Sequence, residues 1–85
     1  MMTITVKTVC GREVAVKFQR CGGLNDCLSL NFPSGKIVSI HRRQHRWVEA
    51  AVAGVVCRYV THHTKEDAMR QAALDYVHET AYAAA

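Results

Sequence analysis

The sequence has a single proline and no apolar run that approaches the roughly 20 residues needed to span a bilayer. Its first residues alternate between polar and apolar types and do not form the continuous apolar segment of a signal peptide. We therefore expect no membrane association and a cytoplasmic location. In that compartment the four cysteines are expected to remain reduced thiols.

The chain also lacks the usual marks of an enzyme. It contains no glycine-rich phosphate loop and no signature around any cysteine, and its seven acidic residues lie mostly in the C-terminal third. A thiol nucleophile would need a histidine base, for example Cys57 with His62 or His63. Cys57 lies in a β-branched stretch, where a small buried residue is the more usual role. We therefore expect a non-catalytic protein without a cofactor.

Acidic residues are scarce in the first half of the chain, so its charge is asymmetric. Residues 1–46 carry eight Lys or Arg and two acidic residues, whereas residues 47–85 carry three Lys or Arg and five acidic residues. The length of 85 residues, with 49% hydrophobic and 21% charged residues, is typical of one folded domain spanning residues 1–85. A basic end of this kind would steer an anionic partner.

Apolar and polar residues alternate within the segment 3–18, on both sides of a short loop, which predicts a β-hairpin. The register that pairs Val6 with Val14 puts the apolar side chains of both strands on one face. It leaves a three-residue loop ending in Gly11, where a left-handed backbone is needed. Residues 19–26 are predicted to form a connecting loop.

A second hairpin is predicted around the turn Pro33-Ser34-Gly35. Its register places Leu30 opposite Val38 and Leu28 opposite Ile40, so that the four side chains share one face.

The next segment, residues 44–53, fits either a helix or a strand, and we favour a strand for its second half. Residues 55–60 are β-branched and aromatic and predict a strand. A loop over residues 52–54 would set Trp47 opposite Tyr59, a favourable cross-strand aromatic pair.

The C-terminal third is predicted to be helical. Thr64 is a suitable N-cap followed by acidic residues, and no Gly or Pro occurs after it. Apolar residues then recur at helical spacing: Met69, Ala72, Ala73, Tyr76 and Val77. The predicted fold class is α+β, with an antiparallel β-meander of four to six strands and one C-terminal α-helix packed on the sheet.

The segment 55–73 resembles the last strand and final helix of double-stranded-RNA-binding domains, where a Ser or Thr and a lysine pair precede spaced alanines. The matching positions are Lys65, Ala68, Ala72 and Ala73. Glu66 and Met69 stand where that family has further lysines, and no helix precedes the strands. A similar helix behind a sheet is found in antitoxins of the HicB type. The resemblance implies a way of packing a helix on a sheet, and no function is carried over.

The densest basic cluster follows the second hairpin, and residues 41–46 are expected to be its exposed continuation. The planar guanidinium group of arginine is well suited to hydrogen-bonding a phosphate, and Trp47 or Tyr59 could stack on a base. The candidate binding residues are Lys36, His41, Arg42, Arg43, His45, Arg46, Trp47 and Tyr59. They predict a small binding or regulatory protein that contacts nucleic acid or a nucleic-acid-associated protein.

Protein contact is the first alternative. Small α+β chains without a catalytic constellation are common among phage and mobile-element products that inhibit a host complex. Arginine and tryptophan are also enriched at protein-binding hot spots. An exposed edge strand would equally allow a homodimer.

Zinc binding is the second alternative. Cys21, Cys27, His41 and His45 are spaced in a way that resembles a two-Cys, two-His zinc finger with inserted residues. Against it, the alternation through His41 predicts a strand, and two histidines four residues apart on a strand stand roughly 13 Å apart. Structural thiols and surface histidines are the simpler interpretation.

Overall fold

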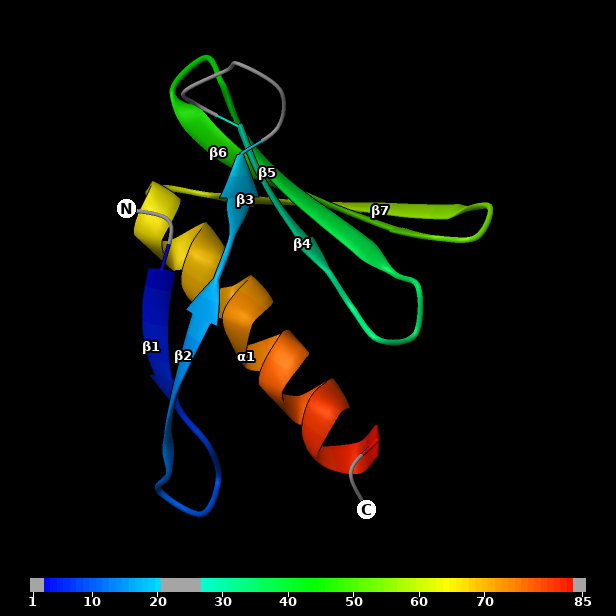
Figure 1. The fold of residues 1–85 in the computed structure, drawn as a ribbon. Helices are drawn as coiled ribbons and strands as arrows, with labels where there is room; N and C mark the ends of the chain where they lie inside the picture. The colour runs from blue at the N-terminus through cyan, green and yellow to red at the C-terminus, as the bar shows by residue number, and fades with distance from the viewer. Residues whose placement is uncertain (1–2, 21–26, 84–85) are drawn as a thin grey trace.

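A computed structural model describes residues 3–20 and 27–83 of the chain, with side chains described as far as residue 80. These residues form β1 (Thr3–Lys7), β2 (Glu13–Lys17), β3 (Gln19–Arg20), β4 (Cys27–Asn31), β5 (Ile37–Arg43), β6 (Arg46–Ala53), β7 (Val56–His62) and α1 (Lys65–Ala83). One antiparallel sheet has the order β3-β4-β5-β6-β7, and β1 with β2 forms a second, two-stranded sheet (Figure 1). The α+β class and the C-terminal helix packed on a sheet are confirmed.

The first hairpin has the predicted register, with Val6 opposite Val14 and Ile4 opposite Val16. Gly11 has a φ of 86°, and its amide donates a hydrogen bond of 3.0 Å to the Thr8 carbonyl. The glycine therefore supplies the left-handed backbone that closes the loop without a Cβ penalty.

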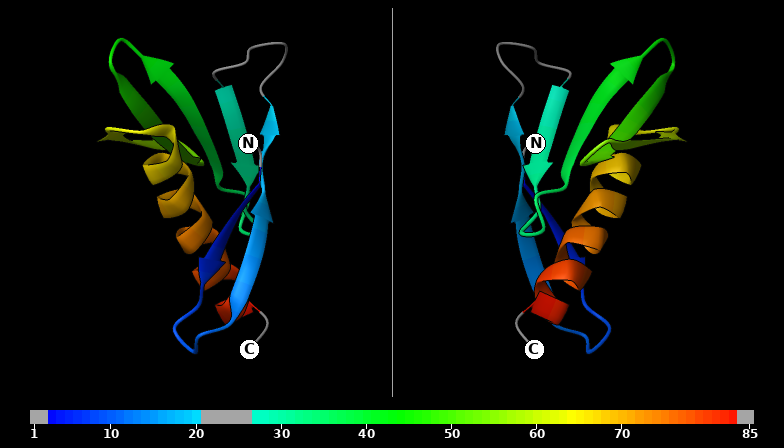
Figure 2. Two further views of the ribbon diagram at one scale, coloured as in Figure 1. Left: turned by 90° about the vertical axis from the view of Figure 1, so that its left-hand side faces the viewer. Right: turned by 90° about the vertical axis from the view of Figure 1, so that its right-hand side faces the viewer.

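The chain passes directly from the first sheet into the second. β2 runs almost straight into β3 (Figure 2). Phe18, the one residue between them, is fully buried. The prediction of a loop over residues 19–26 was wrong at its start, because Gln19 and Arg20 continue the extended chain and pair with β4. Residues 21–26 lie outside the described part of the chain. Phe18 thus joins the two sheets at the core.

The second hairpin also has the predicted register, with Leu30 opposite Val38 and Leu28 opposite Ile40. The Phe32 amide donates a hydrogen bond of 2.8 Å to the Lys36 carbonyl, and Gly35 has a φ of 92°.

The ambiguous segment is a strand, β6, and its pairing with β7 differs from the prediction. The loop is Gly54-Val55 and not residues 52–54, so Trp47 lies opposite His62 and Tyr59 opposite Ala50. Gly54 has a φ of 62° at the first loop position, as tight two-residue hairpin turns require. The change of register puts Tyr59 on the sheet face opposite to that of Trp47.

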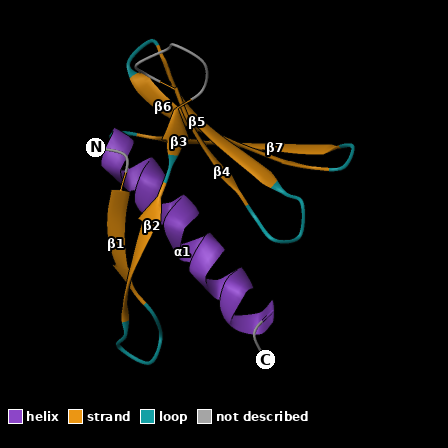
Figure 3. Cartoon of the chain, viewed as in Figure 1, coloured by secondary structure: helices purple, strands orange, loops and turns teal. Residues whose placement is uncertain are grey.

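The helix begins as predicted, because the Asp67 amide donates a hydrogen bond of 3.1 Å to the Thr64 hydroxyl. Its buried residues are Ala68, Met69, Ala72, Ala73 and Val77. They pack with apolar side chains of both sheets in one core cluster. The alanines let the helix axis lie close to the strands, as its position between the two sheets illustrates (Figure 3).

The pleat gives the five-stranded sheet two unlike faces. The helix-facing side carries the large core residues of β4 and β5, such as Val38 and Ile40. We call the other side the open face, and the residues of its last three strands are Ile37, Ser39, His41, Arg43, Arg46, Val48, Ala50, Val52, Cys57, Tyr59 and Thr61. None of them belongs to the core cluster that includes the helix.

Candidate functional site

The basic cluster lies at the closed end of the β5–β6 hairpin. Arg43 and Arg46 are directly opposite each other, and Gln44 and His45 form a two-residue turn between them. Gln44 has a φ of 59°, which is uncommon for a residue other than glycine. The segment predicted as an exposed continuation is therefore the end of a ladder, with residues 42–46 exposed and His41 partly buried.

Strand alternation brings four of the candidate residues together on the open face: His41, Arg43, Arg46 and Tyr59. His45 is exposed in the adjoining turn. A hollow of about 280 Å³ lies there, lined by Arg43, Gln44, His45, Arg46, Val48 and Thr61. Its polar lining is cationic or neutral, so it would accept an anion such as a phosphate.

The remaining candidates lie elsewhere. Arg42 and Trp47 face the helix side, where the partly buried Trp47 packs on the core and the Lys65 Nζ lies 5.5 Å from its ring centroid. Lys36 extends over the Phe32 ring at 4.2 Å from its centroid. Both lysine contacts are cation–π interactions, so each ring already contacts a cation within the fold.

Carboxylates are absent from the open face within the described residues. Glu13 is on β2, Glu49 faces the helix, and the other described acidic residues are on α1: Glu66, Asp67, Asp75 and Glu79. The positive charge of Arg43 and Arg46 is therefore not paired by a neighbouring acid on that face. Such a surface attracts anions.

Tyr59 presents a neutral aromatic ring on the open face. Its side chain is 68% exposed. A hydrogen bond with the Cys57 thiol raises the pKa of the phenol, and the nearby Arg43 acts weakly in the opposite direction. Cys57, predicted as a core residue, is exposed because it stands beside Tyr59 on this outward face of the edge strand. The phenol stays protonated near neutral pH, which suits stacking.

The helix side of the same strands carries a part-buried contact between a histidine and a carboxylate. His62 Nε2 lies 2.9 Å from the Glu49 carboxylate, which is 6% exposed. They border a groove of about 430 Å³ whose other charged residues include Lys36, Arg58 and Asp75. Charges of both signs line this groove, so it favours neither an anion nor a cation.

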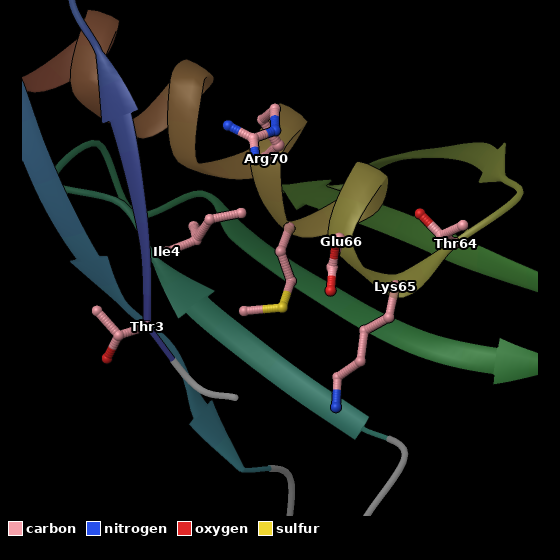
Figure 4. Close-up of a pocket in the computed structure, with 7 residues that line it drawn as sticks. Thr3, Ile4, Thr64, Lys65, Glu66 and Arg70 are labelled. Carbon is pink, nitrogen blue, oxygen red and sulfur yellow. The ribbon is translucent and has the colours of Figure 1, made fainter.

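A further cavity, of about 450 Å³, lies between the start of β1 and the first turns of the helix (Figure 4). Its lining is Thr3, Ile4, Thr64, Lys65, Glu66, Met69 and Arg70. Its lining contains no thiol or histidine, and its charged residues are Lys65, Glu66 and Arg70.

The thiols and histidines do not converge on one point among the described residues. Cys27 lies opposite His41 in the β4–β5 ladder, His45 is in the turn beyond it, and Cys21 lies outside the described residues. Within residues 3–20 and 27–83, no group of three or more His, Cys, Asp or Glu is placed to hold a metal ion. Cys57 and His62 are five residues apart on one strand, so they face opposite sides of the sheet.

Cys10 stands apart in the first hairpin loop. The Thr8 hydroxyl lies 3.1 Å from its sulfur and, with the Arg12 backbone amide, lowers the pKa of this exposed thiol. No candidate base lies in its described contacts, so the lowered pKa reflects loop hydrogen bonding.

No protein-family model, curated protein or solved structure matches this chain. The resemblance to double-stranded-RNA-binding domains therefore has no support from these comparisons, and the positions on which it rests have contacts within the fold. Ala68, Ala72 and Ala73 are fully buried against the sheet, and Lys65 lies over Trp47. Among the described residues, no helix is long and apolar enough to cross a membrane.

Thr61 and Gln44 also line the hollow at the basic turn, although neither was predicted as a binding residue. Thr61 could have been found from the β6–β7 register, since it lies opposite Val48 on the face that Arg46 shares. Because the predicted β6–β7 register was wrong, it did not place Thr61 beside Val48.

Proposed function

We propose that this chain is a non-catalytic nucleic-acid-binding protein that holds a single strand across the open face. One observation carries the proposal. The open face gathers Arg43, Arg46 and an exposed Tyr59, and the described residues place no carboxylate there. Phosphate contacts supply affinity through counterion release, while an aromatic ring adds base stacking.

Each part of the face has a defined role in this proposal. The two guanidinium groups bind phosphates at the hairpin end, and Tyr59 stacks on a base nearer the edge of the sheet. Between them lie small residues, Ser39 and Ala50, which leave space for the sugar–phosphate chain to approach the strands.

The geometry favours a single strand over a duplex. An aromatic ring on a sheet face can stack only on a base that is not already stacked in a helix. A sheet with an exposed tyrosine and flanking arginines offers that platform. Trp47, in contrast, is partly buried on the helix side and is not assigned to base stacking.

The test uses a fluorescent single strand of about 16 nucleotides, the upper range of one small binding fold, in an anisotropy titration at several salt concentrations. The variant Arg43→Ala/Arg46→Ala removes both open-face arginines. We expect it to lose most of the affinity and to reduce the salt slope by about 1.4, which corresponds to two single-strand phosphate contacts.

A matched control is the variant Arg42→Ala/Arg70→Ala, which removes one arginine on the helix side of β5 and one exposed arginine of α1. It changes the net charge equally, and we expect it to bind nearly as the unmodified chain does. Equal losses in the two variants would contradict the assignment to the open face. No binding at about 50 mM salt would reject nucleic acid and favour protein contact of the host-inhibitor type.

A further inference from the structure

The strand β7 is an exposed edge of the five-stranded sheet. It is the last strand in the order β3-β4-β5-β6-β7, and in the described residues its outer side pairs with no strand. Every residue from Val56 to Thr61 is exposed, including the apolar side chains of Val56 and Val60. The backbone amides and carbonyls of alternate residues on this side are therefore available for pairing.

This edge lacks most of the features that normally prevent pairing. β7 spans seven residues without proline, its ladder with β6 runs without a bulge, and Arg58 is its one Lys, Arg, Asp or Glu residue. The opposite edge of the sheet, β3, has two residues. A strand of β7's length and composition is suited to β-addition.

We propose that two copies of this chain pair antiparallel through β7, about a two-fold axis at Tyr59. In this register Tyr59 faces its own copy, Arg58 faces Val60, and Cys57 faces Thr61. The central pair is aromatic, and each arginine lies beside an apolar side chain.

Neighbouring registers are less favourable. Centring the axis on Arg58 would place two guanidinium groups directly opposite each other, and centring it on Val60 would lose the central aromatic pair. Like charges directly opposite are destabilising. Centring on Cys57 or Thr61 shortens the paired segment. The sequence of β7 is therefore self-complementary about Tyr59.

The dimer would join the two open faces. An antiparallel pair related by an axis perpendicular to the sheet keeps each face continuous across the junction. The two Tyr59 rings then meet at the centre of the joined open face. The basic hairpin ends of both copies also lie on this face, one at each end of the two-fold-related pair. The dimer does not depend on nucleic-acid binding, but it would give a strand two linked sites and so raise its avidity.

Two measurements test the proposal in the absence of nucleic acid, on nuclease-treated protein. Sedimentation equilibrium is expected to give twice the chain mass of 9.5 kDa. The variant Thr61→Cys is then oxidised. Because residues directly opposite in an antiparallel ladder have Cα atoms about 4.5–5.5 Å apart, the new thiol can bond to Cys57 of the second copy.

We expect Thr61→Cys to form a covalent dimer on a non-reducing gel, and Cys57→Ser/Thr61→Cys to lose it. The unmodified chain controls for the other thiols. A monomer mass at the concentrations of the anisotropy titration would overturn the dimer. The register would be overturned if the Thr61→Cys chain is dimeric but forms no disulfide between copies. It would also be overturned if the covalent dimer forms equally in Cys57→Ser/Thr61→Cys. The Arg43→Ala/Arg46→Ala variant is expected to stay dimeric, which separates this proposal from the binding proposal.

Discussion

The two faces of the five-stranded sheet are built from the same strands but differ in almost every property. On the helix side, β4 and β5 present large aliphatic residues, and β6 presents the buried Glu49. On the open face, β5, β6 and β7 present serine, alanine, two arginines and a tyrosine, together with the apolar Ile37, Val48 and Val52. Since side chains alternate along a strand, alternate residues of each strand belong to opposite faces, although Val48 and Ala50 are buried on the open face. Substitutions matched across the two faces test this division.

The largest difference is expected between two isoleucines of β5. Ile40 is fully buried on the helix side, whereas Ile37 lies on the open face and is 47% exposed. Ile40→Ala should lower the free energy of unfolding by about 2–5 kcal/mol, because it leaves a cavity in the core. Ile37→Ala should cost less than about 1 kcal/mol, since little buried area is lost.

Denaturant unfolding of the two variants measures this difference. The midpoint should fall strongly for Ile40→Ala and little for Ile37→Ala, with similar slopes. Similar losses at both sites would mean that the open face is covered in solution.

The second difference concerns two adjacent histidines at the end of β7. His62 lies 2.9 Å from the buried Glu49, whereas His63 is exposed. His62→Ala should cost about 1–3 kcal/mol, because it leaves the buried carboxylate without its partner. His63→Ala should change stability by less than about 0.5 kcal/mol.

Thermal unfolding of the two variants side by side provides the measurement. If the His62 and His63 variants melt at the same temperature, the Glu49 pair contributes nothing to the fold. The variant Glu49→Gln is a useful addition, since a neutral amide can still hydrogen-bond to His62 while the buried charge is removed.

Local turn chemistry made the two N-terminal hairpins predictable. Gly11 and Gly35 each close a loop of three residues, and only one register then places the apolar residues of both strands on one face. The helix was equally clear, because its N-cap Thr64 and its spaced alanines are local signals.

The β6–β7 pairing was not predictable for a physical reason. β7 is exposed on both sides over most of its length, so no buried face selects its register. Gly54 closes a two-residue loop, although a three-residue loop was equally compatible with the sequence. The predicted register put Tyr59 on the same face as Trp47, whereas the two residues lie on opposite faces. The candidate residues were also predicted as one cluster, although the neighbours Arg46 and Trp47 point to opposite faces of the sheet.

The smallest expected difference is in single-strand affinity, between substitutions of two threonines on strands. Thr61 lines the hollow beside Arg43 and Arg46 on the open face, and Thr5 is exposed on β1 of the other sheet. Thr61→Glu and Thr5→Glu change the net charge equally. Only the first puts a carboxylate among the proposed phosphate-binding residues, where it would compete for the guanidinium groups.

We expect Thr61→Glu to weaken single-strand binding about fivefold, or about 1 kcal/mol, with the loss shrinking as salt screens the charges. Thr5→Glu should weaken it less than twofold at the same salt. Anisotropy titrations of both variants distinguish a local effect from one of net charge, because equal losses would show that binding follows total charge and not the open face.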